Sequence, residues 1–157
     1  MSYKMLRKSN CALIEYSMGA TQTISNNQII KFDSSTKRTT GNDGVSYNST
    51  TGVLSLDSTK RYWVQASVAI KRSSNSDYAV RWFTSSGGNL DQDDGSFFVV
   101  ARRVRHINSS GTPFVTSSHM ASLVVDYPSV GYRLETSTIP SSSTVTLQTN
   151  LFIIELS

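Results

Sequence analysis

Apolar and polar residues alternate with a period of two along much of this chain. The clearest stretch is residues 62–70, in which every second residue is apolar: Tyr62, Val64, Ala66, Val68 and Ile70. A period of two is typical of a β-strand that buries one face. The opposite face of this stretch begins with Trp63, so we expect it to be partly covered as well. Helical spacing of apolar residues is almost absent, and the chain is therefore predicted to be all-β.

Shorter stretches of the same kind follow one another through the sequence. We predict further strands at residues 12–16, 22–24, 28–32, 44–47, 53–56, 78–84, 97–104, 120–127, 130–136 and 144–156. In the last of them the apolar residues change parity between Leu147 and Phe152, which predicts a bulge or a break near Thr149 and Asn150. About ten antiparallel strands with turn signals every 8–12 residues or so are typical of a β-sandwich or barrel.

Turn signals separate the predicted strands. Residues 47–53 resemble a hairpin turn with Gly52 near its end, and Pro128 marks a turn between two later strands. Beyond Pro128, the residues predicted to face inward are Val130, Tyr132 and Leu134, and those predicted to face outward are Arg133 and Glu135.

The composition fits one sandwich domain. The 157 residues suit a single core. Hydrophobic residues make up 38% and charged residues 17%, against about 45–50% and about 25% in an ordinary globular chain. The difference lies in 28 Ser and 16 Thr, which suit turns and exposed strand faces. Aromatic residues at 10% are too many for a disordered polar chain, and the low hydrophobic share suggests that the domain completes its burial by associating with copies of itself.

Several classes of protein are disfavoured by what the sequence lacks. No apolar run is long enough for a bilayer span or a signal peptide, so no membrane insertion is expected. The single cysteine, Cys11, excludes an internal disulfide framework and a cysteine-based zinc site. The formal charge of +4 is spread over small basic groups near strand ends. We expect no nucleic-acid binding from this pattern and favour attraction to an acidic protein surface.

Catalytic and metal-binding patterns are weak. Asp91, Asp93 and Asp94 precede a glycine, but the spacing of an EF-hand loop fails, so a solvated acidic turn is the default interpretation and a looser metal site the alternative. The two histidines, His106 and His119, have no nucleophile elbow near them, and His119 is predicted at a strand end. We predict no enzyme activity and no cofactor.

Three passages resemble the jelly roll of the tumour necrosis factor family and of complement-type globular heads. They are residues 45–56 followed by 61–68, residues 121–134, and residues 150–156. The family's Gly-Asp turn is replaced here by Tyr-Pro-Ser-Val, and Ile153 stands where the family has a glycine after the aromatic residue. The resemblance predicts a single jelly-roll β-sandwich at residues 21–157, preceded by an N-terminal arm with a first strand at residues 1–20.

The resemblance also implies a homotrimer with aromatic residues around the three-fold axis. The residues predicted at that interface are Tyr62, Trp63, Trp82, Tyr127, Tyr132 and Phe152. The alternative for each of them is the core of the single chain.

The leading functional hypothesis is a bacteriophage or other viral structural protein. It would be a trimeric decoration (cement) protein, made in the host cytoplasm, that binds the major capsid protein and stabilises the shell. The predicted capsid-contact arm comprises Tyr3, Lys4, Met5, Leu6, Arg7 and Lys8. The alternative is the receptor-binding head of a fibre that recognises host surface glycan through residues 73–78 and 85–94.

Overall fold

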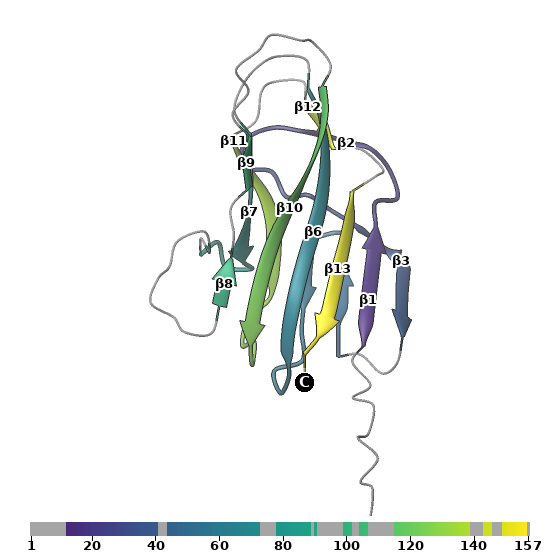
Figure 1. Cartoon of the computed structure of the whole chain (residues 1–157), viewed down its shortest axis with the longest axis vertical. Coiled ribbons are helices and arrows are strands. Elements are labelled where there is room, and N and C mark those ends of the chain that lie inside the picture. The colour runs from purple at the N-terminus through teal and green to yellow at the C-terminus, as the bar shows by residue number, and fades with distance from the viewer. Residues whose placement is uncertain are drawn as a thin grey trace, which may run out of the picture.

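A computed structural model gives the fold. It describes residues 12–40, 44–72, 78–88, 90, 99–101, 104–106, 115–138, 143–145 and 149–156. Within these ranges the chain forms strands and no helix, as the alternation predicted (Figure 1). The strands are β1 (Leu13–Ser17), β2 (Gln22–Ile24), β3 (Asp33–Thr40), β4 (Ser46–Asn48), β5 (Val53–Ser55), β6 (Arg61–Arg72), β7 (Tyr78–Thr84), β8 (Val99–Ala101), β9 (Val104–His106), β10 (Val115–Asp126), β11 (Tyr132–Thr138), β12 (Ser143–Val145) and β13 (Asn150–Glu155).

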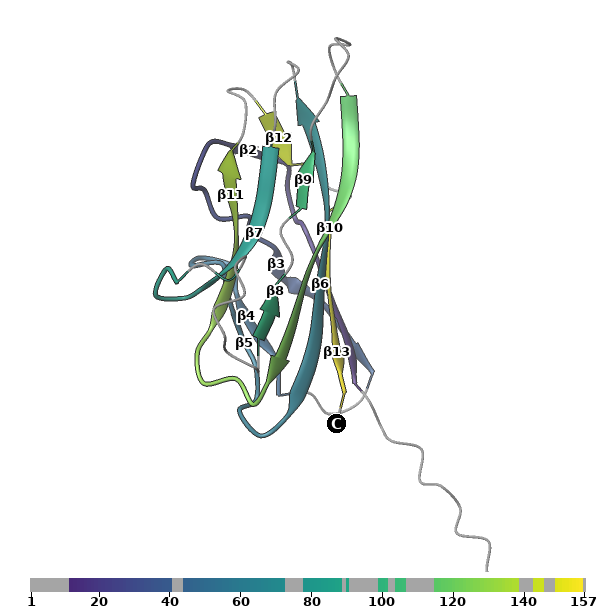
Figure 2. The same cartoon turned by 60° about the vertical axis from the view of Figure 1, so that its left-hand side comes forward.

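The strands form two antiparallel sheets that face each other (Figure 2). In the larger sheet β6 pairs with β10 along one side and with β13 and β12 along the other. Outside β13 lie β1 and then β3, while β8 pairs with β10. The smaller sheet has the order β4-β5-β11-β7-β9. This arrangement confirms the predicted all-β jelly-roll sandwich.

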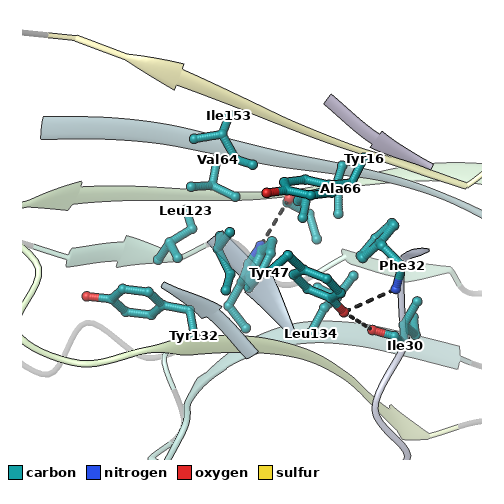
Figure 3. Packing of buried hydrophobic residues seen from close by; sticks show 14 of the residues in the cluster. Tyr16, Ile30, Phe32, Tyr47, Val64, Ala66, Leu123, Tyr132, Leu134 and Ile153 are labelled. Atoms are coloured by element: carbon teal, nitrogen blue, oxygen red, sulfur yellow. Dashed lines mark hydrogen bonds between the residues drawn. The ribbon is translucent and has the colours of Figure 1, made fainter. Parts of the chain in front are cut away.

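The core between the sheets is rich in aromatic side chains (Figure 3). The ring centroids of Tyr16 and Tyr47 are 5.5 Å apart, and those of Phe32 and Tyr47 are 5.7 Å apart. Trp82 on the smaller sheet donates its indole N–H to the carbonyl oxygen of Ala121 on the larger sheet, at 3.2 Å. The core therefore joins the sheets through ring packing and at least one directed hydrogen bond.

Tyr47 places a hydroxyl group inside this core. Its oxygen accepts a hydrogen bond from the backbone N–H of Phe32 at 3.1 Å and donates to the carbonyl of Ile30 at 3.4 Å. Burial raises the pKa of Tyr47 to about 12. The hydroxyl thus satisfies backbone groups of residues 30–32, which lead into β3.

Replacing Tyr47 by phenylalanine is expected to lower the free energy of unfolding by about 1–3 kcal/mol, because the N–H of Phe32 loses its acceptor in a buried position. Urea unfolding of the two proteins measures the difference. Tyr127→Phe is the matched control, since Tyr127 is 60% exposed. Equal stability of Tyr47→Phe and the parent would show that this hydrogen bond contributes nothing net.

The alternation predicted β2 and β7 with their observed bounds, whereas the long strand β10 begins at Val115, five residues before its predicted start. The stretch at residues 28–32 is not a strand, apart from an isolated bridge between Ile29 and Glu135. The strand lies one step later, as β3, which has no apolar residue and stands at the edge of the larger sheet. It is held by backbone pairing with β1 and by Thr36, whose hydroxyl accepts the N–H of Ser17 at 2.8 Å. Hydrophobic periodicity carries no signal for such a strand.

Two other stretches divide into separate strands. Residues 97–104, predicted as one strand, contain β8 in the larger sheet and the first residue of β9 in the smaller one. The predicted break near Thr149 is confirmed, because β12 ends at Val145 and β13 begins at Asn150. In β13 the core-facing residues include Leu151 and Ile153, while Phe152 and Ile154 are on the opposite face.

Two predictions for single residues were wrong. Val130 is 44% exposed because it lies in the turn before β11 rather than in the strand. Glu135 shares the outward side of β11 with Arg133, as predicted, and forms an ion pair with it, but it is only 6% exposed because the chain around Ile29 runs alongside it. His119 is not at a strand end but lies within β10, opposite Val68. The predicted inward positions of Tyr132 and Leu134 are confirmed, since both are buried.

Candidate self-association face

The outer face of the larger sheet, turned away from the core, carries side chains in rows that cross the strands. Residues paired in register stand opposite each other, so the register fixes the members of each row. One row is apolar where it crosses β1, β13, β6 and β10, and it continues to Thr40 on β3. We call it the apolar row, and its members are Leu13, Ile154, Trp63 and Val124.

The apolar row is only partly covered by the chain itself. Leu13 is 45% and Trp63 is 38% exposed. Together with Phe152, Gln65 and Ile154 they line a shallow hollow of about 160 Å³. An apolar cavity of about 150 Å³ accommodates benzene, so this hollow has room for one large apolar side chain. The clustering of these exposed apolar residues makes the hollow a candidate interaction site.

The outer face becomes more polar from the beginning of β1 toward its end. The row next to the apolar row consists of Glu15, Phe152, Gln65 and Ser122. The third row consists of Ser17, Asn150, Ser67 and Met120. The side-chain amide of Gln65 donates to the sulfur of Met120 at 2.6 Å. Met120 is 59% exposed at that end of the face. The half of the face where β1 begins and β13 ends (Figure 1) differs in having four adjacent apolar residues in one row.

Two ion pairs lie beyond the apolar row, at the end of the sheet where β6 begins and β13 ends. Arg61 pairs with Asp126, which stands opposite it in the β6–β10 register, and this raises the pKa of Arg61 above its ordinary value. The ammonium nitrogen of Lys60 lies 2.9 Å from a carboxylate oxygen of Glu155, and that hydrogen bond raises the pKa of Lys60. An exposed pair such as that of Arg61 adds little stability. Lys60 and Glu155 are less exposed, with side chains 28% and 12% accessible.

The structure divides the predicted interface residues into three places. Tyr62, Trp82 and Tyr132 have exposed fractions of 0%, 1% and 2%, so they are core residues of the single chain and are not used in the interface proposed below. Trp63 and Phe152 are on the outer face of the larger sheet, at the hollow. Tyr127 is exposed, but in the turn between β10 and β11.

Sequence reasoning missed Leu13 and Ile154 as members of this face. A signal was present for Ile154, which shares the parity of Phe152 in the last strand. No such signal existed for Leu13, because its place beside Ile154 follows from the pairing of β1 with β13, at opposite ends of the sequence.

Other predicted sites lie outside the described residues. These are the arm residues Tyr3, Lys4, Met5, Leu6, Arg7 and Lys8, the acidic residues Asp91, Asp93 and Asp94, and most of the two loops considered for glycan binding. Among the residues that the structure does describe, no group of three or more His, Cys, Asp or Glu side chains is arranged to hold a metal ion. In the same part of the chain, no helix is long and apolar enough to cross a membrane.

The architecture is that of a two-sheet jelly roll, and several solved structures are similar to this chain. The tumour necrosis factor Eiger of S. frugiperda superposes with a TM-score of 0.54 at 10% sequence identity, over 94% of this chain and 92% of that chain. The PRD1 vertex protein P5 gives 0.43 at 15% identity, over 94% and 96%. Murine APRIL gives 0.39 at 12% identity, over 93% and 99%. No family model and no curated protein sequence matches the chain. The chain thus has the tumour necrosis factor-like jelly-roll fold that the sequence resemblance predicted.

Proposed function

We propose that this chain is a trimeric structural protein of a virion, a decoration protein that binds the capsid shell and stabilises it. The observation that carries the proposal is the apolar row with its hollow, which the single chain leaves uncovered. A second copy of the chain is the proposed occupant. The second copy carries the same exposed apolar residues on the outer face of its larger sheet, and one of these side chains would fill the hollow of the first copy.

The row arrangement supports a ring of copies around an axis along the strands. Rotation about such an axis keeps every residue at its own height, so the apolar row of one copy meets the apolar row of the next. The ion pair of Arg61 with Asp126 would then lie at the rim of the ring, and the row of Ser17 and Asn150 at the opposite side. The number of copies, three, is taken from the family resemblance.

A trimer would bind the shell through its arms. The eleven residues before Ala12 include Lys4, Arg7 and Lys8, which suit an acidic protein surface. Three weak attachments on one rigid body bind far more tightly than one, because the second and third are intramolecular. The lack of an internal disulfide framework in a chain with one cysteine fits a structural protein of this kind better than a secreted signalling domain.

Two measurements on the purified full-length chain test the proposal. Sedimentation equilibrium is expected to give three times the chain mass of 17.3 kDa. Co-sedimentation with capsids of the encoding virus, stripped of accessory proteins, is expected to show saturable binding and a higher capsid melting temperature. A monomer at micromolar concentration, or a trimer that binds host cells and leaves capsids unoccupied, would contradict the proposal.

A further inference from the structure

The outer face of the larger sheet carries a methionine that is open to water. Met120 lies on β10 and is 59% exposed. Its register partner on β6 is Ser67, which has a small side chain. The other methionine among the described residues, Met18, is 5% exposed and belongs to the core. Of these two thioethers, only that of Met120 is accessible to a dissolved reagent.

The side-chain amide of Gln65 holds the thioether of Met120 in one orientation. Gln65 lies on β6, diagonally across from Met120, because its own register partner on β10 is Ser122. The amide nitrogen of Gln65 donates a hydrogen bond to the sulfur. A thioether sulfur is a weak acceptor, and it carries two lone pairs. The hydrogen bond covers one lone pair and leaves the other facing away from Gln65.

This geometry matters for oxidation, because the two lone pairs lead to different products. An oxygen atom added at one lone pair gives one epimer of methionine sulfoxide, and an oxygen added at the other gives the opposite epimer. In a flexible, exposed methionine both lone pairs are about equally open. In Met120 the amide of Gln65 makes them unequal, so one epimer is favoured.

We propose that Met120 is a site of reversible oxidation by hydrogen peroxide and that Gln65 directs the oxygen to one lone pair. The sulfur attacks one oxygen of the peroxide, the S–O bond forms as the O–O bond breaks, and the second oxygen leaves as water with both protons. The sulfur loses two electrons and the peroxide gains them. The sulfoxide reductase that is specific for the epimer, with a thiol as reductant, restores the methionine and releases water. This inference does not rest on the proposed function, because it needs only the folded chain.

Oxidation leaves the fold intact and changes the outer face of the larger sheet. The side chain of Met120 lies mostly in water, so its sulfoxide stays hydrated and the core is not disturbed. The sulfoxide is polar where the thioether is apolar. The change takes place in contact with Gln65, which also lines the hollow beside Trp63 and Phe152.

Treatment of the full-length protein with hydrogen peroxide, followed by peptide mapping in a mass spectrometer, tests the site. Met120 is expected to gain one oxygen about tenfold faster than Met18, because the rate follows the exposure of the sulfur. In concentrated urea the two rates should become similar, and the melting temperature of the oxidised protein should equal that of the parent. Trp63→Asp is treated in parallel, because a carboxylate there opposes association through the apolar row. Fast oxidation of Met120 in either protein supports the inference, and similar slow rates for Met120 and Met18 in both proteins overturn it.

The ratio of the two epimers tests the role of Gln65. The peptide that contains the oxidised Met120 is incubated with each of the two epimer-specific sulfoxide reductases in turn, with dithiothreitol as reductant. The parent is expected to give an excess of one epimer of about threefold, which a weak hydrogen bond sustains. Gln65→Glu keeps the shape of the side chain but lacks the amide N–H, so its ratio should be near one. Ser122→Ala, on the same face, is the matched control and should keep the parental ratio. Equal epimers in the parent, or an undiminished excess in Gln65→Glu, would show that Gln65 does not direct the oxygen.

Discussion

Replacing Trp63 by aspartate is expected to convert the proposed trimer into folded monomers. Trp63 is 38% exposed in the single chain, so a carboxylate there remains hydrated and the monomer stays folded. In the ring of copies the same carboxylate would be buried in the apolar row without a cation, once in each copy. Burying an unpaired charge costs several kcal/mol per ion, which exceeds what a few apolar contacts contribute. Light scattering gives the mass, and circular dichroism confirms the fold.

The control for this prediction is Thr51→Asp, which adds the same charge to an exposed position in the hairpin turn of the smaller sheet. It is expected to remain trimeric. Trp63→Phe keeps an aromatic group at the hollow and should weaken the trimer only modestly. If Trp63→Asp sediments as a trimer at micromolar concentration, the outer face of the larger sheet is not the interface.

Removal of residues 2–10 is expected to leave a folded trimer that no longer saturates capsids. The first described strand, β1, begins after the deletion at Leu13 and keeps its pairing with β13 and β3. Loss of three arms at once removes the multivalent attachment, so the affinity should fall by about two orders of magnitude or more. Co-sedimentation with stripped capsids measures the binding, and sedimentation equilibrium measures the trimer.

Two arm variants identify which part of the segment matters. Replacing Lys4, Arg7 and Lys8 by serine should abolish the salt dependence of capsid binding, because screened charges act only at low ionic strength. Replacing Tyr3, Met5 and Leu6 by serine should weaken binding equally at all salt concentrations. A truncated protein that saturates capsids at the parental concentration would show that the arm has no role.

The sequence predicted the fold class well because the long strands alternate clearly. β6 buries Tyr62, Val64 and Ala66 as its pattern indicates, and the outer position of Trp63 follows from the same parity. The same rule excludes Tyr62 and Trp63 from a shared face, since neighbouring residues of a strand point to opposite sides. The alternation along the strand could therefore have separated core residues such as Tyr62 from outer residues such as Trp63 in the predicted interface. The prediction was made from aromatic content, which does not distinguish the two faces.

What could not be predicted depends on pairing between distant segments. The hollow needs Leu13 from β1 beside Ile154 of β13, and no local pattern specifies which strands become neighbours. The edge strand β3 could not be predicted for another reason. It has no apolar residue, so its sequence has no hydrophobic period. The left-handed backbone of Tyr127 also lies beyond sequence rules, since an aromatic residue is not expected there.

The pairing of β1 with β13 has a consequence for the timing of assembly. The apolar row combines Leu13 and Ile154, which a ribosome adds near the beginning and near the end of this sequence. A nascent chain that stops short of β13 cannot display the row, and it leaves β1 and β6 without the strand that lies between them. Non-local pairing of this kind makes folding slow. If copies associate through the apolar row, a chain that lacks β13 cannot join them, because it lacks Ile154 and the strand that pairs with β1.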